Sequence, residues 1–244
     1  MGVTVIFAST SGIAEAVSEE FLQRDYDILL CARDEQALAR QAQDLKVKFN
    51  RDVPYMQWDL QPMDAHAEKV RSLFEEYHVD GLFMAAGVMS PQAECNQDPS
   101  KVIETMQINL TAVTVILNLF AEQFEQKKTG FISCISSVAG DRGRQSNYVY
   151  GASKAGLTAF LQGLRNRLHR HDVLVQTVKP GYVKTKMTEE LGESILMAKP
   201  KQVAKEIVDA IERKQDILYT PFFWRYIMST IKWIPEPLFK RLSL

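Results

Sequence analysis

The chain is poor in cysteine. Among its 244 residues only three are cysteine, namely Cys31, Cys95 and Cys134, and two of them fall within apolar, strand-like runs. Their spacing matches no metal motif, and a small buried hydrophobe is the ordinary role of such a residue, so we expect neither a disulfide nor a zinc site. The four histidines also form no metal or nucleophile spacing, and we expect them at the surface.

The chain also lacks an excess of charge and any linker-like tract. It carries 29 Lys and Arg against 30 Asp and Glu, and this balance argues against a nucleic-acid partner. No signal-peptide pattern separates Met1 from the first strand-like segment, so we expect a cytoplasmic protein. With 46% hydrophobic residues and no repeat or low-complexity segment, the chain fits one α/β domain better than two.

Short apolar runs alternate with longer segments of helical periodicity, which is typical of a parallel sheet covered on both faces. The predicted strands are Val3–Ala8, Tyr26–Ala32, Val53–Gln57, Gly81–Ala85, Gly130–Ser136, Val173–Lys179 and Ile217–Tyr219. The predicted helices are Ile13–Arg24, Glu35–Phe49, Ala65–Tyr77, Lys101–Gln126, Gly151–His169 and Lys201–Arg213. The pattern predicts a doubly wound α/β Rossmann fold, with a seven-stranded, mostly parallel sheet and helices on both faces.

A tyrosine and a lysine four residues apart are the most informative pair in the chain. In the stretch Tyr150-Gly151-Ala152-Ser153-Lys154 the two side chains lie one helical turn apart on one face. A lysine ammonium beside a phenol favours the phenolate, so we predict that the pKa of Tyr150 lies below its usual value of about 10. Ser137, thirteen residues upstream, ends an apolar run.

Together with Pro180-Gly181-Tyr182-Val183-Lys184-Thr185, these residues resemble the classical short-chain dehydrogenase/reductase family. The family has a serine, a tyrosine and a lysine at this spacing, and its corresponding loop reads Pro-Gly-x-Val-x-Thr. The resemblance runs from Val3 to about Tyr219. It implies a nicotinamide-dependent oxidoreductase, with residues 1–220 as a single Rossmann domain and residues 221–244 as an apolar and basic C-terminal extension.

The resemblance also implies roles for four residues. Ser137 would hydrogen-bond the carbonyl oxygen of the substrate, and Tyr150 would exchange a proton with it. Lys154 would lower the pKa of Tyr150 and hold the nicotinamide ribose. Asn109 falls where the family has an asparagine that kinks a long helix and supports a water relay to the lysine; the alternative is a helix-interior amide that points at solvent.

The loop expected to bind the dinucleotide lacks most of the family's pattern, Thr-Gly-x-x-x-Gly-x-Gly. Phe7, Ala8 and Ala14 replace the threonine, the first glycine and the last glycine, and only Gly12 remains. Ala8 requires the first turn to keep φ below zero. The loop still lies between a strand and a helix, where a helix N-terminus can bind pyrophosphate. A plain strand-to-helix turn of small residues is the alternative.

The end of the second strand decides the cofactor. Ala32 occupies the position where an acidic residue would bind the ribose of NAD, and Arg33 follows with a forked donor suited to a 2′-phosphate. We therefore expect NADP(H), with NAD(H) as the alternative if Arg33 is solvated and Asp34 binds the ribose. The expected cofactor-binding residues are Ser9, Ser11, Gly12, Ile13, Arg33, Asp59, Leu60, Ala86, Gly87, Tyr150, Lys154, Pro180, Gly181, Val183 and Thr185.

The tail after Thr220 departs from the usual family pattern. If residues 222–234 are helical, Arg225, Ser229 and Lys232 form a narrow polar stripe between apolar and aromatic positions. Such a helix is too short to cross a bilayer but suits a membrane interface, and its alternatives are core packing, covering of the last strand or a subunit interface. Residues 187–198 could form a lid or a packed surface helix.

This tail and the small-residue loop look loosely similar to a bacterial subgroup near the ketoreductase of decaprenylphosphoryl arabinose synthesis, which suggests a lipid-linked sugar ketone as one substrate. These features favour an NADP(H)-dependent enzyme that transfers hydride between the nicotinamide and a carbonyl or secondary alcohol. Family analogy adds a homo-oligomer. A nucleotide-binding regulator on the same fold and a membrane-docked interaction subunit are the two alternatives.

Overall fold

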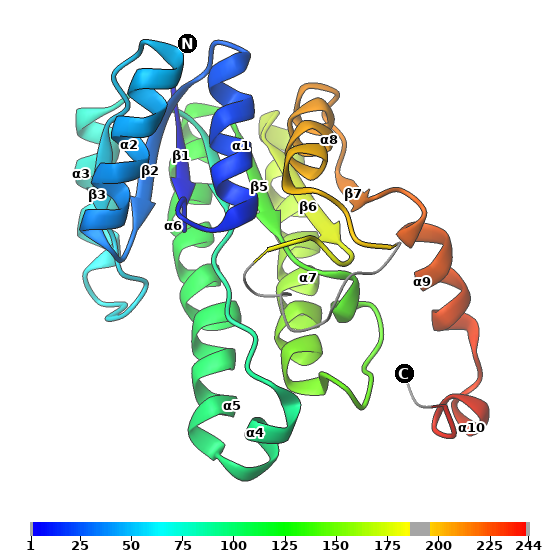
Figure 1. Ribbon diagram of the computed structural model, residues 1–244. Coiled ribbons are helices and arrows are strands. Elements are labelled where there is room, and N and C mark those ends of the chain that lie inside the picture. The colour runs from blue at the N-terminus through cyan, green and yellow to red at the C-terminus, as the bar shows by residue number, and fades with distance from the viewer. Residues whose placement is uncertain (1, 186–195, 243–244) are drawn as a thin grey trace.

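A seven-stranded parallel sheet forms the centre of the computed structural model, which describes residues 2–185 and 196–242 (Figure 1). The strands are β1 Val3–Phe7, β2 Asp27–Ala32, β3 Tyr55–Gln57, β4 Val79–Met84, β5 Phe131–Ile135, β6 Leu174–Pro180 and β7 Ile217–Thr220. Their order is β3-β2-β1-β4-β5-β6-β7, and each neighbouring pair is parallel. The predicted strands and the predicted fold are therefore confirmed. The order reverses direction between β1 and β4, which is where folds of this type bind ligands.

Helices cover both faces of the sheet (Figure 1). On one face α1 packs against α8, and on the other α6 packs against α3 and α7. The helices that correspond to predicted segments are α1 Gly12–Gln23, α2 Glu35–Phe49, α3 His66–Glu76, α5 Pro99–Met106, α6 Val113–Lys127, α7 Tyr148–Leu168 and α8 Pro200–Glu212. The short helices α4 Gln92–Gln97 and α10 Glu236–Phe239 were not expected, whereas α9 Trp224–Trp233 confirms the helix expected in the tail.

The long helix predicted over Lys101–Gln126 contains one irregular turn. Between α5 and α6 the chain forms the π-helical segment η1, Gln107–Ala112. The whole run Pro99–Lys127 is long and apolar enough to span a membrane by length and composition, a test that core helices of soluble proteins also pass. Here Ile116 and Phe120 of α6 are fully buried in the core cluster beneath the sheet.

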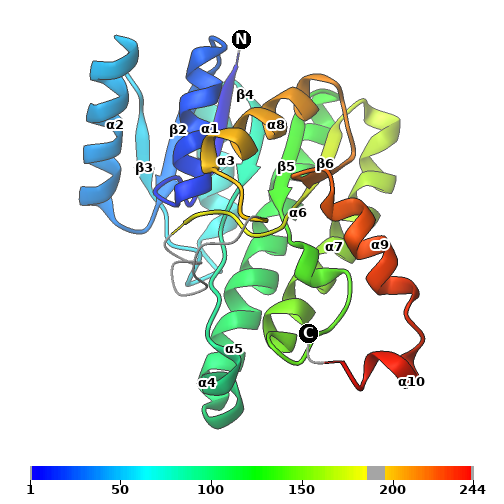
Figure 2. The same cartoon turned by 45° about the vertical axis from the view of Figure 1, so that its right-hand side comes forward.

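The C-terminal helices α9 and α10 lead away from the end of β7, on the side where the chain connects β5 to α7 (Figure 2). Trp224 and Met228 of α9 are buried against Val138, which follows β5. The tail therefore contacts the segment just after Ser137. Residues 187–195 of the expected lid segment lie outside the described residues.

Candidate active site

Four predicted site residues meet at the carboxyl edge of the sheet. Ser137 comes two residues after β5, Tyr150 and Lys154 lie on α7, and Asn109 lies in the π-helical turn. Ser137 is 8% exposed, and its Oγ accepts a hydrogen bond from the backbone N of Ala139 at 3.0 Å. The Ser137 hydroxyl lies close enough to the Tyr150 phenol to lower the pKa of that phenol. The structure thus places the serine beside the tyrosine.

Two glycines allow this arrangement. The short 3-10 turn η2, Val138–Gly140, packs directly on α7. A Cβ at Gly140 would come within 2.7 Å of the backbone carbon of Lys154, and one at Gly151 would come within 3.0 Å of the carbonyl oxygen of Ala139. A larger residue at either position would separate the turn from the helix and move Ser137 away from Tyr150.

Lys154 is buried in the interior of the site, with 2% of its surface exposed. Its Nζ donates to the carbonyl oxygen of Ile135 at 3.0 Å and lies 5.8 Å from the ring centroid of Tyr150. A Cβ at Gly87 would lie 3.2 Å from Nζ, so a glycine there leaves room for the amine. Burial lowers the pKa of Lys154 to about 8, because the charged form loses its hydration.

The predicted direction of the Tyr150 pKa shift is wrong for the protein chain alone. Burial raises the pKa of Tyr150 to about 12, and the nearby Ser137 hydroxyl offsets this only in part. The ammonium of Lys154 lies over the tyrosine ring and donates a hydrogen bond to the carbonyl oxygen of Ile135. One helical turn of separation is therefore not sufficient for the lysine to outweigh the desolvation of the phenol.

Asn109 connects the loop after β4 to α7. Its Oδ1 accepts from the backbone N of Val88 at 2.7 Å, and its Nδ2 donates to the carbonyl oxygen of Val88 at 2.8 Å and to Ser153 Oγ at 3.1 Å. The side chain is fully buried, so the alternative of a solvent-facing amide is wrong. The expected irregularity of the long helix is present as a π turn, a feature that is frequent at functional sites.

The dinucleotide loop differs from the expectation at Ala8. We expected φ below zero there, but Ala8 has φ of 54° and occupies the small left-handed region that favours glycine. Two backbone hydrogen bonds hold the turn, from Ser9 N to the Cys31 carbonyl at 3.1 Å and from Ser11 N to the Ala8 carbonyl at 2.9 Å. The loop therefore keeps a glycine-like conformation although the residue is alanine, at a cost of about 1 kcal/mol.

Gln41 of α2 also holds this loop, a contact that no pattern in the sequence indicates. Ser9 Oγ donates to Gln41 Oε1 at 2.9 Å, and Gln41 Nε2 donates to the Ser9 carbonyl at 2.9 Å. The two residues are 32 positions apart, so no local motif could have linked them. At the other side of the loop, Thr185 contacts Gly12, where a Cβ would lie 3.2 Å from its methyl carbon.

A cavity of about 370 Å³ lies between this loop, the end of β2 and the loop after β4. Of the expected cofactor residues, those that line it are Ser11, Arg33, Asp59, Leu60, Ala86 and Gly87. The lining residues that we did not expect are Phe7, Ala8, Thr10, Ala32, Asp34, Trp58, Gln61, Val88, Glu104 and Ile108. Asp34 caps α2 by accepting from Ala37 N at 3.0 Å, whereas Arg33 is exposed at the rim. The cavity therefore offers a cationic side chain next to a helix N-terminus.

His66 is buried, so the expectation that all four histidines lie at the surface is wrong. Its Nδ1 accepts from Trp58 Nε1 at 3.2 Å, and its Nε2 lies 3.0 Å from the Leu60 carbonyl. Because Nδ1 accepts, the proton is on Nε2, which donates to Leu60. The imidazole therefore links both ends of the Trp58-Asp59-Leu60 turn at the cavity. No group of three metal-ligating side chains occurs within residues 2–185 and 196–242.

The remaining expected residues lie at the end of β6. Pro180 ends the strand, Gly181 N donates to the Thr220 carbonyl at 3.0 Å, and Val183 pairs with Ala198. A Cβ at Gly181 would overlap the indole of Trp224. This segment thus lies between β7, the tail and the dinucleotide loop.

The chain matches known proteins along nearly all of its length. A family model for short chain dehydrogenases matches residues 2–195. An oxidoreductase of Streptomyces coelicolor is 30% identical over 98% of this chain and 94% of its own length, and one of Mycobacterium tuberculosis is 29% identical over 98% and 96%. Neither relative has a name that states a substrate.

Two solved structures illustrate the likeness in fold. A short-chain dehydrogenase from Sphingobium yanoikuyae in complex with NADPH has a TM-score of 0.83 at 24% identity, over 99% of this chain and 96% of that one. A short chain dehydrogenase from Burkholderia cenocepacia in complex with NADP has a TM-score of 0.84 at 20% identity, over 100% and 98%. The sheet order, the site geometry and the family match agree, and the chain belongs to the short chain dehydrogenase family.

Proposed function

We propose that this protein is an NADP(H)-dependent oxidoreductase that interconverts a carbonyl compound and a secondary alcohol. The observation that carries the proposal is the meeting of Ser137, Tyr150 and Lys154 at the carboxyl edge of the sheet. A hydroxyl, a phenol and an amine in this arrangement can polarise a carbonyl oxygen and protonate it. Binding of a nucleotide alone would not require the three to meet.

The residues around the cavity fit a dinucleotide phosphate. The N-terminus of α1 and the left-handed turn at Ala8 present backbone N–H groups, and Arg33 offers a forked donor for a 2′-phosphate. The carboxylate of Asp34 accepts from the N-terminus of α2, which weakens the alternative in which it binds the ribose of NAD. The named complexes of relatives with NADP or NADPH support the same choice. When bound, the nicotinamide supplies or accepts the hydride.

Residues of the chain would then supply the proton and stabilise the negative charge that develops on the carbonyl oxygen. Ser137 hydrogen-bonds the carbonyl oxygen, and Tyr150 donates a proton to it as negative charge develops. A Tyr150 pKa of about 12 keeps the phenol protonated at neutral pH, which suits the direction of reduction. Lys154, with a pKa of about 8, is mostly protonated at pH 7 and can donate to the nicotinamide ribose. By family likeness, Asn109 supports a water-mediated proton path to the lysine.

Replacement of the phenol tests this assignment. Tyr150→Phe should lower kcat for reduction by about 100-fold or more while leaving the Kd for NADPH within about twofold, because the ring remains and only the proton donor is lost. Tyr148→Phe is the matched control, since Tyr148 lies on the same helix but is exposed and bonded to Asn96. NADPH oxidation is measured against a panel of carbonyl compounds, with NADH in parallel. Near wild-type reduction by Tyr150→Phe would refute the assignment.

The same panel separates the enzyme from a nucleotide-binding regulator. A regulator would bind NADPH with no turnover on any carbonyl, and Tyr150→Phe would then change nothing. The eroded dinucleotide loop is the feature that favours a regulator, but Ala8 holds the conformation that a glycine would adopt. This weakens the regulator alternative.

Exposed aromatic residues on the C-terminal segment favour a second, peripheral role at a membrane. Phe222, Tyr226 and Trp233 are 72%, 67% and 84% exposed, and Arg225 and Lys232 lie among them. Aromatic and basic side chains on a short helix suit the interface of an anionic bilayer. We therefore extend the proposal to a cytoplasmic enzyme that docks at the inner face of a membrane and reduces a lipid-linked sugar ketone.

Flotation with anionic liposomes tests this docking. The full chain should float, and the triple variant Phe222→Ser/Tyr226→Ser/Trp233→Ser should stay in the protein fraction while keeping its activity on soluble carbonyls. Removal of residues 221–244 is the coarser comparison. Equal partitioning of the full chain and the triple variant would exclude the membrane role. A subunit interface would then be the role to test for these aromatic side chains.

Oligomerisation belongs to the proposal as well. Ile103 on α5 is an exposed large hydrophobe, on the long helical run that pairs subunits in many family members. Light scattering after size-exclusion chromatography should give a multimer of the 27.7 kDa chain, and Ile103→Glu should shift the distribution toward smaller species. A monomer at micromolar concentration would exclude it.

A further inference from the structure

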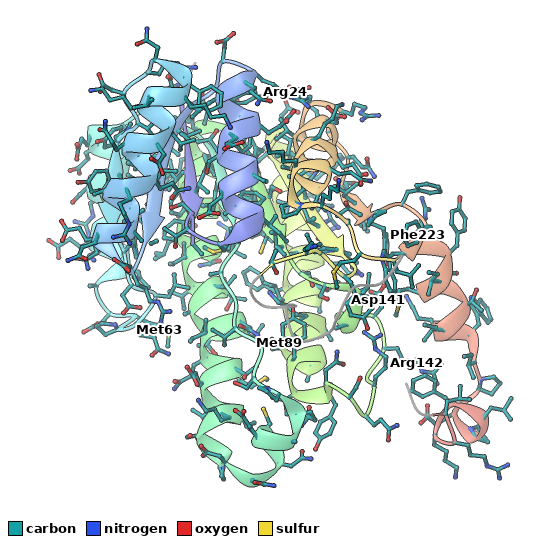
Figure 3. The ribbon with its side chains drawn as sticks, viewed as in Figure 1. Arg24, Met63, Met89, Asp141, Arg142 and Phe223 are labelled. Atoms are coloured by element: carbon teal, nitrogen blue, oxygen red, sulfur yellow. The ribbon has the colours of Figure 1, made fainter. Side chains whose placement is uncertain are left out.

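The C-terminal helices α9 and α10 pack against the loop that begins with Ser137. Arg142, five residues after the serine, reaches the C-terminal end of α9 (Figure 3). Its Nη1 donates to the carbonyl oxygens of Ile231 at 2.7 Å, Lys232 at 3.1 Å and Ile234 at 2.6 Å. These carbonyls lie at or just beyond the C-terminus of α9, where the helix dipole is negative, so the guanidinium stabilises this end of the helix; the Ile231 carbonyl also accepts from Ile234 N at 3.3 Å.

The same guanidinium also contacts α10. Its Nη2 lies 2.9 Å from the carboxylate of Glu236, and its central carbon lies 3.7 Å from the ring centroid of Phe239. One side chain thus uses hydrogen bonds, an ion pair and a cation–π contact on two successive helices. Arg142 therefore fixes the loop after β5 and the tail relative to each other.

Asp141, the residue before it, fixes the same loop to the sheet. It is ion-paired with Lys179 near the end of β6, and both side chains are buried. Its second carboxylate oxygen accepts from the hydroxyl of Tyr219 in β7 at 2.8 Å. The loop is therefore attached to two strands by Asp141 and to the tail by Arg142.

The tail also contacts the loop after β6. Trp224 is 4% exposed, its indole occupies the space where a Cβ of Gly181 would lie, and its ring packs edge-on against Tyr182 at 5.5 Å. Val138, one residue after Ser137, packs in the same cluster. Within the described part of the chain, the buried indole N–H of Trp224 has no hydrogen-bond partner. An unpaired buried donor costs about 1 to 3 kcal/mol, so its retention needs a reason beyond packing.

We propose that α9 and α10 help to form the substrate-binding side of the active site. Arg142 and Trp224 are the residues that position them against it. Arg142 sets the loop that carries Ser137, Trp224 sets the loop at Gly181, and the carbonyl substrate binds between these two loops. The inference rests on the proposed function. The cavity assigned to the cofactor is lined by residues 7–108 and by none of the tail, so the contacts of Arg142 with the tail should affect the carbonyl and not the dinucleotide.

Steady-state kinetics of two variants test the proposal. Arg142→Gln and Trp224→Leu should each raise the KM for the carbonyl at least tenfold. In Arg142→Gln the Kd for NADPH, measured by fluorescence, should stay within twofold. A purely structural role would lower the active fraction, and so kcat, without changing the KM. Arg225→Gln is the matched control, because Arg225 is an exposed arginine of the same helix α9.

A second measurement keeps the test valid if activity is low. In Arg142→Gln, amide hydrogen exchange should become faster both in residues 137–142 and in residues 225–239, because the two segments lose their common contact. Unchanged carbonyl KM values in an active enzyme, or unchanged exchange in residues 137–142, would overturn the coupling. A wild-type protein that reduces no carbonyl would instead overturn the proposed function on which the coupling rests.

Discussion

Replacement of Lys154 by methionine should stabilise the protein while abolishing its activity. The pKa of Lys154 falls from an ordinary 10.5 to about 8 on folding, because the ammonium is buried. The difference of about 2.5 pKa units corresponds to about 3 kcal/mol of destabilisation at pH 7, at about 1.4 kcal/mol for each unit. Loss of the hydrogen bond to the Ile135 carbonyl costs about 1 kcal/mol, so Lys154→Met should be more stable than wild type by about 2 kcal/mol.

The pH dependence of the stability difference between Lys154→Met and wild type is the more specific test. Between pH 8 and 10.5 the unfolded chain holds more protons on Lys154 than the folded chain does, so the stability of the wild type rises with pH in that window. At pH 9.5 the pH lies one unit below the pKa of Lys154 in the unfolded chain. The burial of Lys154 then destabilises the folded protein by only about 1.4 kcal/mol. The advantage of the variant should therefore shrink by about 2 kcal/mol between pH 7 and pH 9.5.

Urea denaturation at several pH values measures both quantities. The free energies of unfolding of wild type, Lys154→Met and Lys201→Met are compared at each pH without added nucleotide. Lys201→Met is the control for the loss of a lysine at the surface, because Lys201 is exposed on α8. A Lys154→Met curve parallel to the wild-type curve, or one that diverges as pH rises, would refute the assignment of a buried lysine whose pKa is lowered on folding.

Three further predictions concern the cofactor side. Ala8→Gly should stabilise the fold by up to about 1 kcal/mol, because φ is positive at Ala8. Ala14→Gly, inside α1, should destabilise the fold by about the same amount. Thermal melts in which the two variants shift the Tm in the same direction would contradict this. Arg33→Ala should raise the KM for NADPH about tenfold or more and leave that for NADH nearly unchanged, and an equal effect on both would remove the 2′-phosphate contact. His66→Leu should lower the free energy of unfolding by about 2 kcal/mol, since Trp58 N–H and the Leu60 carbonyl lose their partner; denaturation that matches wild type would exclude that link.

The sheet and most of its helices could be predicted because their signals are local. Apolar runs and helical periodicity depend on neighbouring residues, and the seven strands and six long helical segments follow from them. For the strands and helices, a short stretch of sequence contained the whole argument. The placing of Ser137 beside Tyr150 and Lys154 was expected instead from the resemblance to the family, because local geometry relates only Tyr150 to Lys154.

The errors arose where distant residues decide the outcome. Ala8 adopts a positive φ because hydrogen bonds from other segments hold its loop, among them the pair from Gln41. His66 is buried because two polar partners enclose its ring. The pKa of Tyr150 rises because burial, which depends on the complete fold, outweighs a neighbouring charge. None of these could be derived from spacing along the chain.

Three local costs fall at the same edge of the sheet, although each has a different physical origin. Ala8 carries backbone strain, Lys154 carries a buried charge, and the indole N–H of Trp224 has no partner among residues 2–185 and 196–242. A fold under selection for stability alone would remove each of them with one substitution, and strained or desolvated groups persist mainly where function requires them. All three lie near the carboxyl ends of the strands, where Ser137, Tyr150 and Lys154 meet. The Trp224→Leu variant tests whether the third of these costs belongs to the same site.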